Sequence, residues 1–376
     1  MNVAYFSNHF VESEGHGIAR YVRQLYEAIH DLRSDIRLMP VSSLSEEKIQ
    51  NITRLKEKSN LKLLPWGRYM TALSWGFLKR PYLEHWLGNA FDLVHAPALG
   101  YPVPTKKPYL VTVHDIGPLT RPELFSKRSV RWMKLGFDHM VKRAAGIVCV
   151  SQATADEVLS RTGKQLGDRL HVIHEGIDPL FFDEPDRKCL EGLLGLPPEG
   201  TPFCLAAGAI SPRKNVLRVV QAMEKLKDDL PHHVCLVGGA GWDAREVFDR
   251  FRDSPITDRI HHLGYVSDAQ LHAMYSLADV FVYPSLFEGF GLPVLEAMAS
   301  GCPVVTSNIS SLPEVTGDAA VLVDPYDVQV IAEAIFEICS NSSFATQLSE
   351  LGKKRAKKFT WNQCAEQVAQ TYRSVA

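Results

Sequence analysis

The sequence predicts an α/β protein with two domains, and three observations support this prediction. The chain has 376 residues, too many for one ordinary core and enough for two domains of roughly 180 residues each. Short β-branched segments alternate with helical segments through both halves, as in βαβ units. Residues 1–180 contain 24 Lys and Arg against 18 Asp and Glu, whereas residues 181–376 contain 17 against 25. The opposite net charges indicate two domains with different surfaces.

The predicted strands are short apolar runs. In the first half they are Asn2–Ser7, Ile36–Val41, Leu93–His95, Tyr109–His114, Ile147–Ser151 and Leu170–His174. In the second half they are Phe203–Gly208, Val234–Gly238, Ile260–Leu263, Val280–Tyr283, Pro303–Thr306 and Val321–Val323. After the first strand, apolar residues recur at helical spacing; they are Ile18, Tyr21, Val22, Leu25 and Ile29. Because strands joined through helices pair in parallel, we expect one parallel sheet in each half.

A stretch rich in proline and glycine, residues 183–202, predicts the linker between the domains. We therefore expect an N-terminal domain over residues 1–182 and a C-terminal domain over residues 203–358. Residues 359–376 have the pattern of a separate amphipathic helix.

The composition is that of an ordinary soluble protein, with 45% apolar and 22% charged residues. The seven cysteines are odd in number and form no Cys-x-x-Cys pair, which argues against a disulfide framework and a zinc site. No signal peptide and no apolar run of about 18 residues is visible. We expect a cytoplasmic protein, or one bound to the cytosolic face of a membrane, with no nucleic-acid partner.

Polar residues directly after predicted strands are candidate ligand contacts, because ligands of parallel α/β sheets bind beyond the carboxyl ends of the strands. Gly17 lies in a glycine-containing loop before the first helix, where free N–H groups attract phosphate. His114 follows the strand from Tyr109 and can donate to a ligand hydroxyl or polarise a developing charge. An ordinary strand–helix turn and a histidine satisfied by local backbone are the alternatives.

Adjacent cations, Arg213 and Lys214, follow the strand that ends near Gly208 and precede a helix that begins near Val216. Fixed cations at a helix N-terminus match the needs of a diphosphate leaving group. A solvated pair of surface charges is the alternative.

The most informative segment contains two glutamates. Pro293 suits the first turn of a helix, so Glu296 lies within the first turns and Glu288 in the loop before them. Gly291 allows backbone N–H groups to point at a ligand. Two carboxylates facing one pocket can each accept several hydrogen bonds from hydroxyl groups. Glu296 could instead be an acid favoured by the helix dipole.

Basic and aromatic residues are mixed over residues 54–86. From Arg54 to Arg80 there are seven Lys or Arg and one acid. The aromatic residues among and just beyond them are Trp66, Tyr69, Trp75, Phe77 and Trp86. This mixture suits an anionic membrane surface; an ordinary helical hairpin packed by its aromatics is the alternative.

These motifs resemble the retaining glycosyltransferases of family 4, which have the GT-B architecture, and the resemblance runs essentially end to end. Its most specific mark is a pair of glutamates in the context E-G-F-G-x-P-x-x-E, matched by Glu288 and Glu296. The stretch 304–325 is similar to a subgroup rich in mannosyltransferases of bacterial surface polysaccharides. The resemblance implies two Rossmann-like domains with parallel sheets facing across a cleft. The N-terminal domain would bind the acceptor, the C-terminal domain the nucleotide sugar, and the final helix would cross back to the N-terminal domain.

The resemblance also implies residue roles. The catalytic residues would be His114, near the reacting carbon, and Glu288, on hydroxyls of the transferred sugar. The donor-binding residues would be Gly17, Arg213, Lys214, Phe290, Gly291, Leu292 and Glu296. Among them, Arg213 and Lys214 would hold the diphosphate and Glu296 the ribose.

Three departures from the family pattern bear on these roles. Ala209 stands where many members have an arginine that binds the diphosphate, so Arg213 and Lys214 would have to bind the diphosphate without it. His16 stands where a small residue is usual. Ser267 stands where some guanine-selective members have an aspartate, which weakens any assignment of the base.

The expected activity is transfer of a hexose, best guessed as mannose from GDP-mannose, to a hydroxyl of a glycan or lipid-linked acceptor. The sequence contains no Asp-x-Asp, so we expect no metal and no cofactor, with the diphosphate neutralised by cations and helix dipoles. We expect front-face transfer with retained configuration. The alternatives are a UDP-glucose-type donor with a small-molecule acceptor, a nucleotide-sugar epimerase of GT-B type, and a non-catalytic binding subunit.

Overall fold

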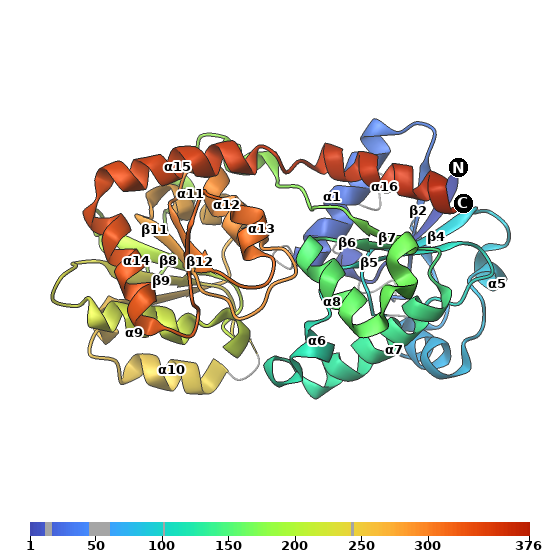
Figure 1. Cartoon of the computed structure of the whole chain (residues 1–376), viewed down its shortest axis with the longest axis horizontal. Coiled ribbons are helices and arrows are strands. Elements are labelled where there is room, and N and C mark those ends of the chain that lie inside the picture. Colours follow the sequence, from blue (N-terminus) through green and yellow to red (C-terminus); the bar gives the residue numbers. More distant parts are fainter. Residues whose placement is uncertain (12–16, 45–60, 101, 242–243) are drawn as a thin grey trace. The chain divides into compact units, whose positions relative to one another are not determined.

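The computed structural model describes residues 1–11, 17–44, 61–100, 102–241 and 244–376. The chain divides into two compact units (Figure 1). Unit 1 contains Met1–Gly176 and Thr360–Ala376, and unit 2 contains Ile177–Phe359. Each unit is an α/β domain with its own parallel sheet, which confirms the predicted fold class.

The sheet of unit 1 has seven parallel strands in the order β3-β2-β1-β4-β5-β6-β7. They are β1 (Asn2–Phe6), β2 (Arg37–Ser42), β3 (Lys62–Leu63), β4 (Leu93–Ala96), β5 (Tyr109–Val113), β6 (Gly146–Cys149) and β7 (Leu170–Val172). The helices are α1 (Gly17–Leu32), α4 (Gly67–Leu73), a π-helical turn (Ser74–Leu78), α5 (Glu84–Leu87), α6 (Gly117–Thr120), α7 (Lys127–Arg143), α8 (Gln152–Thr162) and α16 (Trp361–Val375). The predicted face of α1 is buried at Tyr21, Val22, Leu25 and Ile29.

Helix α16 packs against α1 in unit 1 (Figure 1). A buried histidine ties it to the sheet: His95 Nδ1 lies 2.7 Å from the Tyr372 hydroxyl, and His95 Nε2 lies 2.9 Å from Thr112 Oγ1. Burial lowers the pKa of His95 to about 3, so the ring is neutral and one nitrogen donates while the other accepts. A side chain at Gly176 would have its Cβ 2.3 Å from the backbone nitrogen of Trp361. Only glycine at position 176 therefore permits this contact with the start of α16.

The sheet of unit 2 has six parallel strands in the order β10-β9-β8-β11-β12-β13. They are β8 (Phe203–Ala207), β9 (His233–Val237), β10 (Ile260–Gly264), β11 (Val280–Tyr283), β12 (Val304–Ser307) and β13 (Val321–Val323). The helices are α9 (Val216–Lys225), α10 (Ala244–Arg252), α11 (Asp268–Leu277), α12 (Leu292–Ala299), α13 (Leu312–Thr316), α14 (Val328–Ser340) and α15 (Ser342–Ala356).

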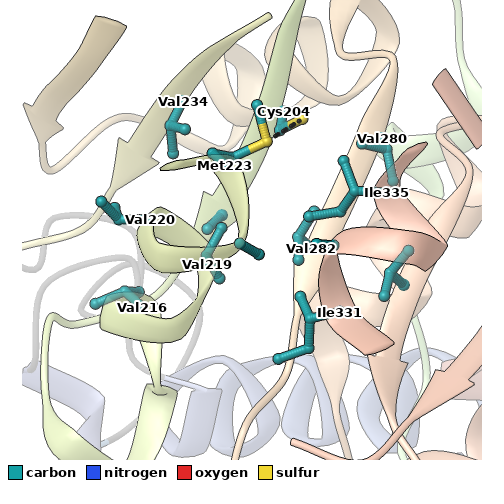
Figure 2. Close-up of a cluster of buried hydrophobic side chains, with 14 of the residues drawn as sticks. Cys204, Val216, Val219, Val220, Met223, Val234, Val280, Val282, Ile331 and Ile335 are labelled. Atoms are coloured by element: carbon teal, nitrogen blue, oxygen red, sulfur yellow. Dashed lines mark hydrogen bonds between the residues drawn. The ribbon is translucent and has the colours of Figure 1, made fainter. Parts of the chain in front are cut away.

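In the core of unit 2, helices α9 and α14 pack against the central strands (Figure 2). Helix α9 contributes Val219 and Met223, β11 contributes Val280 and Val282, and α14 contributes Ile335. All are at most 2% exposed. This apolar contact fixes α9 and α14 on the sheet and so fixes the loops that follow β8 and β11.

The structure differs from the sequence prediction at three places, the first being that residues 177–182, predicted in the N-terminal domain, lie in unit 2. Strand β3 was not predicted, because two residues are too few to show a period. Residues 183–202, the predicted linker, lie in unit 2 and hydrogen-bond to it: His272 Nε2 lies 3.0 Å from the Asp183 carbonyl, and Gln270 Nε2 donates to the Cys189 carbonyl at 3.1 Å. Proline and glycine there mark turns of an ordered segment.

Candidate active site

The strand order of unit 2 has a switch point between β8 and β11. From β8 the chain continues to β9 and β10 on one side, and then returns to place β11 on the other side of β8. Ligands of open α/β sheets bind at such a point, outside the carboxyl ends of the strands. Arg213 and Lys214 follow β8 and Glu288 follows β11. The topology therefore brings these predicted residues to one edge of the sheet.

The loop after β8 is held by Asn215. Arg213 and Lys214 lie in a single 3-10 turn, Pro212–Lys214, and Asn215 then adopts a left-handed conformation with φ 58° before α9 begins. The Asn215 side-chain amide donates to the carbonyls of Pro284 and Pro325, at 2.8 Å each. These bonds connect the loop after β8 to the loops after β11 and β13. The two cations are thus fixed in position by neighbouring loops.

Both cations contact Glu288. Its Oε1 atom lies 2.8 Å from Arg213 Nη1 and 2.8 Å from Lys214 Nζ. Ser285 Oγ donates to the same oxygen at 2.6 Å and the Tyr283 hydroxyl at 3.0 Å. Lys214 Nζ also contacts the Tyr283 hydroxyl. We call these residues, Arg213, Lys214, Tyr283, Ser285 and Glu288, the Glu288 cluster.

The Glu288 cluster carries a net positive charge. Burial of Glu288 favours its neutral form, but the charges of Arg213 and Lys214 outweigh this and lower the pKa of Glu288 to about 2. At neutral pH the cluster therefore holds two cations and one carboxylate. A buried site with one excess positive charge attracts an anion such as a diphosphate.

The backbone around Glu288 is fixed by two serines. Ser311 Oγ donates to the Glu288 carbonyl at 3.0 Å and to the Phe290 carbonyl at 2.7 Å. The Glu288 backbone nitrogen donates to Ser310 Oγ at 3.1 Å. These hydrogen bonds hold the backbone of the loop that precedes α12 in place at Glu288 and Phe290.

The second glutamate lies where the sequence predicted it, in the first turns of α12. This helix begins at Leu292 and is preceded by Gly291, whose φ of 117° requires glycine. Glu296 is buried, and the Tyr275 hydroxyl lies 3.5 Å from its Oε2 atom. Phe290 is also buried. Glu296 is therefore within the same loop–helix unit as Glu288 but outside the Glu288 cluster.

His114 belongs to unit 1, where it follows β5 and pairs with a residue that the sequence did not single out. His114 Nδ1 lies 2.9 Å from Glu175 Oε1 and Nε2 lies 3.0 Å from the Pro97 carbonyl oxygen. Tyr21 packs edge-on against the ring at 4.6 Å between centroids. Because both neighbours are acceptors, the ring donates from both nitrogens as an imidazolium. A direct hydrogen bond to a ligand requires release of one of these contacts.

The pKa of His114 agrees with this geometry. Burial disfavours the charged ring, but the hydrogen bond to Glu175 and its charge outweigh burial and raise the pKa above the ordinary value. Glu175 is itself buried. The pair is therefore a buried ion pair at the carboxyl edge of the first sheet.

The remaining predicted sites are less defined. Gly17 is the first residue of α1, while Glu14, Gly15 and His16 lie outside the described residues. Ser267 caps α11 and exchanges hydrogen bonds with Gln270, so its side chain has a structural role. Among the described residues, no group of three or more His, Cys, Asp or Glu side chains could hold a metal ion.

The basic and aromatic stretch is described only from residue 61. Trp75 is buried in the core of unit 1, as in the packed-hairpin alternative. Tyr69, Phe77 and Leu78 are 69%, 58% and 73% exposed, which that alternative does not explain. In the part of the chain that the structure describes, no helix is long and apolar enough to cross a membrane.

Several residues that hold the site were not predicted. Tyr283, Ser285, Asn215 and Glu175 make the contacts described above; they lie within or beside the segments that the sequence singled out, but no role was assigned to them. The position of Tyr283 at the end of a predicted strand was the available signal, because strand ends border the ligand edge.

Two family models match the chain. The model described as "Glycosyltransferase Family 4" matches residues 15–180, and the model described as "Glycosyl transferases group 1" matches residues 195–355. Among curated proteins, the chain is 30% identical to O-antigen chain mannosyltransferase B of Escherichia coli, over 95% of this chain and 96% of the relative.

Solved structures agree with the fold. Sucrose-phosphate synthase from Thermosynechococcus elongatus matches with a TM-score of 0.78 and 22% identity, over 99% of this chain and 98% of that one. HepE from Anabaena, solved in complex with UDP and glucose, matches with a TM-score of 0.75 and 18% identity, over 99% of each chain. These likenesses support the GT-B fold.

Proposed function

The chain belongs to the family 4 glycosyltransferases, and we propose that it is a retaining, metal-independent mannosyltransferase of polysaccharide biosynthesis. Its donor would be GDP-mannose, and its acceptor a hydroxyl of a glycan or lipid-linked glycan. The observation that carries this proposal is the Glu288 cluster, which presents two fixed cations beside an ionised carboxylate at the switch point of unit 2. The full-length relative in Escherichia coli is named a mannosyltransferase, which favours mannose as the sugar.

The roles of the residues follow from their charge. Lys214 and Arg213 would bind the donor diphosphate, and Glu288 would accept hydrogen bonds from hydroxyls of the sugar. Phe290, Gly291 and Leu292, at the start of α12, would offer backbone N–H groups, while Glu296 would bind the ribose. Gly17 would lie near the diphosphate. Because Lys214 and Arg213 neutralise the leaving group, no metal or cofactor is needed in this scheme.

We propose a front-face reaction. The bond between the sugar anomeric carbon and the diphosphate oxygen breaks, and the acceptor oxygen bonds to the same face of that carbon. The acceptor proton passes to the leaving diphosphate. Retaining hydrolases use a second carboxylate about 5 Å away as nucleophile, and the Glu288 carboxylate is instead tied to Arg213 and Lys214. His114 would contact the sugar near the reacting carbon after one of its hydrogen bonds, to Glu175 or to the Pro97 carbonyl, is released.

Ser267, where some guanine-selective members have an aspartate, caps a helix with its side chain. A UDP-glucose-type donor with a small-molecule acceptor is the second candidate. An epimerase is not supported, because the relatives named above include a transferase over nearly the full length of the chain.

The test is a donor comparison with product analysis. We expect GDP-mannose to raise the melting temperature more than UDP-glucose, because a ligand at 100 times its dissociation constant adds about 2.7 kcal/mol. Transfer should continue in excess EDTA, and the NMR coupling constant of the new linkage should report the donor's α configuration. An inverted product would contradict the retaining mechanism, and loss of activity in EDTA with rescue by Mg²⁺ would contradict metal independence.

We also propose that the exposed surface around the π-helical turn contacts an anionic membrane. The exposed apolar side chains of this surface are Trp66, Tyr69, Met70, Leu73, Phe77 and Leu78. Basic residues lie beside them: Lys79 and Arg80 follow Leu78 directly, and Arg80 and Lys106 line one hollow together with Trp66 and Leu78. An apolar face with cations beside it suits the interface of anionic lipid. Such a surface would bring the enzyme to a lipid-linked acceptor.

A further inference from the structure

Tyr283, the last residue of β11, contacts the charged end of Lys214 with both its ring and its hydroxyl group. Lys214 Nζ lies 4.7 Å from the centroid of the Tyr283 ring, as in a cation–π contact, and it also contacts the Tyr283 hydroxyl. Tyr283 is only 2% exposed, and its ring stacks on that of Phe281 at 5.5 Å between centroids. A ring held by the core in this way is a fixed support for a flexible side chain.

The stem of Lys214 is held by a second contact. A Cβ atom on Gly208, which directly follows β8, would lie 3.2 Å from Lys214 Cε and 3.5 Å from Lys214 Cδ. The lysine side chain therefore passes close to the backbone of Gly208 and ends on Tyr283. Because β8 and β11 are neighbouring strands, these two contacts place the Lys214 ammonium at the switch point of unit 2.

The hydroxyl group of Tyr283 connects Lys214 to Glu288. Burial and then the charge of Glu288 raise the pKa of Tyr283, so the hydroxyl group keeps its proton. It donates a hydrogen bond to Glu288 Oε1 at 3.0 Å, and its oxygen accepts one from the Lys214 ammonium. Both hydrogen bonds have a charged partner, and such hydrogen bonds are the stronger ones in proteins.

We propose that Tyr283 is a positioning residue that holds the Lys214 ammonium where the donor diphosphate binds. This inference rests on the proposed function, in which Lys214 binds the diphosphate. A lysine side chain loses much rotamer freedom when a ligand fixes it. A cation that is already fixed does not lose this freedom on binding, so the donor binds more tightly. Tyr283 acts through Lys214 and needs no contact of its own with the donor.

Glu288 depends less on Tyr283 than Lys214 does. Its Oε1 atom is also contacted by Arg213, Lys214 and Ser285, so these contacts remain when the Tyr283 hydroxyl is removed. By contrast, Tyr283 contacts the end of Lys214 with both its ring and its hydroxyl. Loss of the hydroxyl should therefore release Lys214 more than Glu288.

The test compares the affinity of the full-length enzyme for GDP and for guanosine, which lacks the diphosphate. Tyr283→Phe keeps the ring and removes the hydroxyl. We expect the dissociation constant for GDP to rise about tenfold, as for the loss of a hydrogen bond to a charged group, and that for guanosine to stay unchanged. UDP and uridine replace this pair if the donor comparison selects a UDP sugar. If both ligands bound more weakly, the substitution would have disturbed the whole site and the positioning role would be wrong.

A double-mutant cycle shows whether Tyr283 acts through Lys214. In the Lys214→Ala background, Tyr283→Phe should change the dissociation constant for GDP by less than about twofold, because the group that it positions is gone. If the effects of the two substitutions multiplied instead, Tyr283 would act independently of Lys214 and this proposal alone would fail. If Lys214→Ala left the affinity for GDP unchanged, the diphosphate site of the proposed function would be wrong, and the positioning role with it.

Tyr109→Phe is the matched control, because it removes a buried tyrosine hydroxyl at the start of β5 in unit 1. It should leave both dissociation constants unchanged. Tyr283→Leu removes the ring as well, so we expect it to bind GDP at least about threefold more weakly than Tyr283→Phe does. Equal affinities of these two variants would contradict the cation–π part of the proposal. Circular dichroism checks the fold of each variant, and Tyr283→Phe alone decides the test if Tyr283→Leu does not fold.

Discussion

Lys214 is the single residue whose removal should affect catalysis most. Its amino group contacts Glu288 and Tyr283 at the switch point of unit 2, and its side chain is only 10% exposed. A charged group in such a site stabilises a leaving diphosphate by about 3 kcal/mol. We therefore expect Lys214→Ala to lower kcat/KM by about 100-fold or more in steady-state transfer assays.

The matched control for Lys214 is Lys227→Ala, which removes an exposed lysine of the same unit. It should leave kcat/KM within about twofold of the unmutated enzyme, as for most surface substitutions. If Lys214→Ala behaved in the same way while both variants stayed folded, the assignment of the diphosphate site would be wrong.

The His114–Glu175 ion pair predicts how the stability of the fold depends on pH. Because the folded-state pKa of His114 is raised, the pair stabilises the fold fully below the unfolded value of about 6.5. This stability is lost as the pH rises through the folded-state pKa. Glu175→Gln keeps an acceptor but removes the charge, so the pKa of His114 should fall.

An NMR titration of the His114 ring carbon, assigned with His114→Asn, measures the pKa of His114 in the unmutated protein and in Glu175→Gln. We expect the midpoint of the unmutated protein to lie above 6.5 and that of Glu175→Gln to lie lower. In transfer assays, the loss of activity at high pH should begin at lower pH in the variant. Identical midpoints would mean that Glu175 does not set the charge of the ring.

Sequence reasoning identified the charged residues of the candidate site but not the residues that contact them. Arg213, Lys214, Glu288 and Glu296 were predicted because charged groups next to strand ends and glycines are uncommon enough to be noticed. Tyr283 and Ser285 were missed, because a hydroxyl near a strand end is as often structural as functional. Contacts between residues distant in sequence, such as His114 with Glu175, become visible only in the folded chain.

At the scale of elements, the strands were predictable and the connections were not. The predicted strand Val280–Tyr283 has the bounds of β11, and Phe203–Gly208 overlaps β8, since a buried parallel strand is a continuous apolar run. Residues 183–202 instead lie in unit 2. Proline and glycine report local turns, and they do not say whether the segment between turns packs against a domain.

The close contact between Gly176 and the start of α16 predicts that a larger residue at position 176 destabilises unit 1. An alanine Cβ at Gly176 would lie 2.3 Å from the Trp361 backbone nitrogen and 2.6 Å from its Cα. Backbone atoms cannot yield as a flexible side chain can, so Gly176→Ala should destabilise unit 1 by about 2 kcal/mol or more. Differential scanning calorimetry should find a melting temperature several degrees lower.

Gly167→Ala is the control for this change, because nothing lies within 4 Å of the Cβ position there. It should leave the melting temperature nearly unchanged. If the Gly176→Ala and Gly167→Ala proteins had the same melting temperature, α16 would not need the close approach to residue 176.

The charge of the whole molecule is unevenly distributed, with a net +6 over residues 1–180 and −8 over residues 181–376. Net charge of one sign attracts a protein to a surface of the other sign, and salt screens this attraction beyond about 10 Å at 0.1 M. The basic half also contains the exposed apolar surface around the π-helical turn. The two features together predict binding to anionic lipid and weak binding to neutral lipid.

Two matched variants separate the apolar contribution from the electrostatic one. Phe77→Ser with Leu78→Ser removes two side chains that are 58% and 73% exposed, while Leu194→Ser removes one that is 87% exposed in the acidic half. Likewise, Lys79→Glu with Arg80→Glu reverses charges beside the apolar surface, and Lys357→Glu with Lys358→Glu reverses two exposed charges of unit 2. Only the first variant of each pair should weaken co-sedimentation with anionic liposomes.

The salt dependence completes the prediction. Each basic residue near an anionic surface contributes about 1 kcal/mol, so Lys79→Glu with Arg80→Glu should lower the partition coefficient at low salt by at least about tenfold. At 1 M salt, where the Debye length is about 3 Å, the charge-reversed and unmutated proteins should partition alike. The loss caused by Phe77→Ser with Leu78→Ser should persist there, because apolar burial is not screened. Equal partitioning to anionic and neutral liposomes at low salt would rule out this surface as an anionic-lipid site and favour a soluble acceptor.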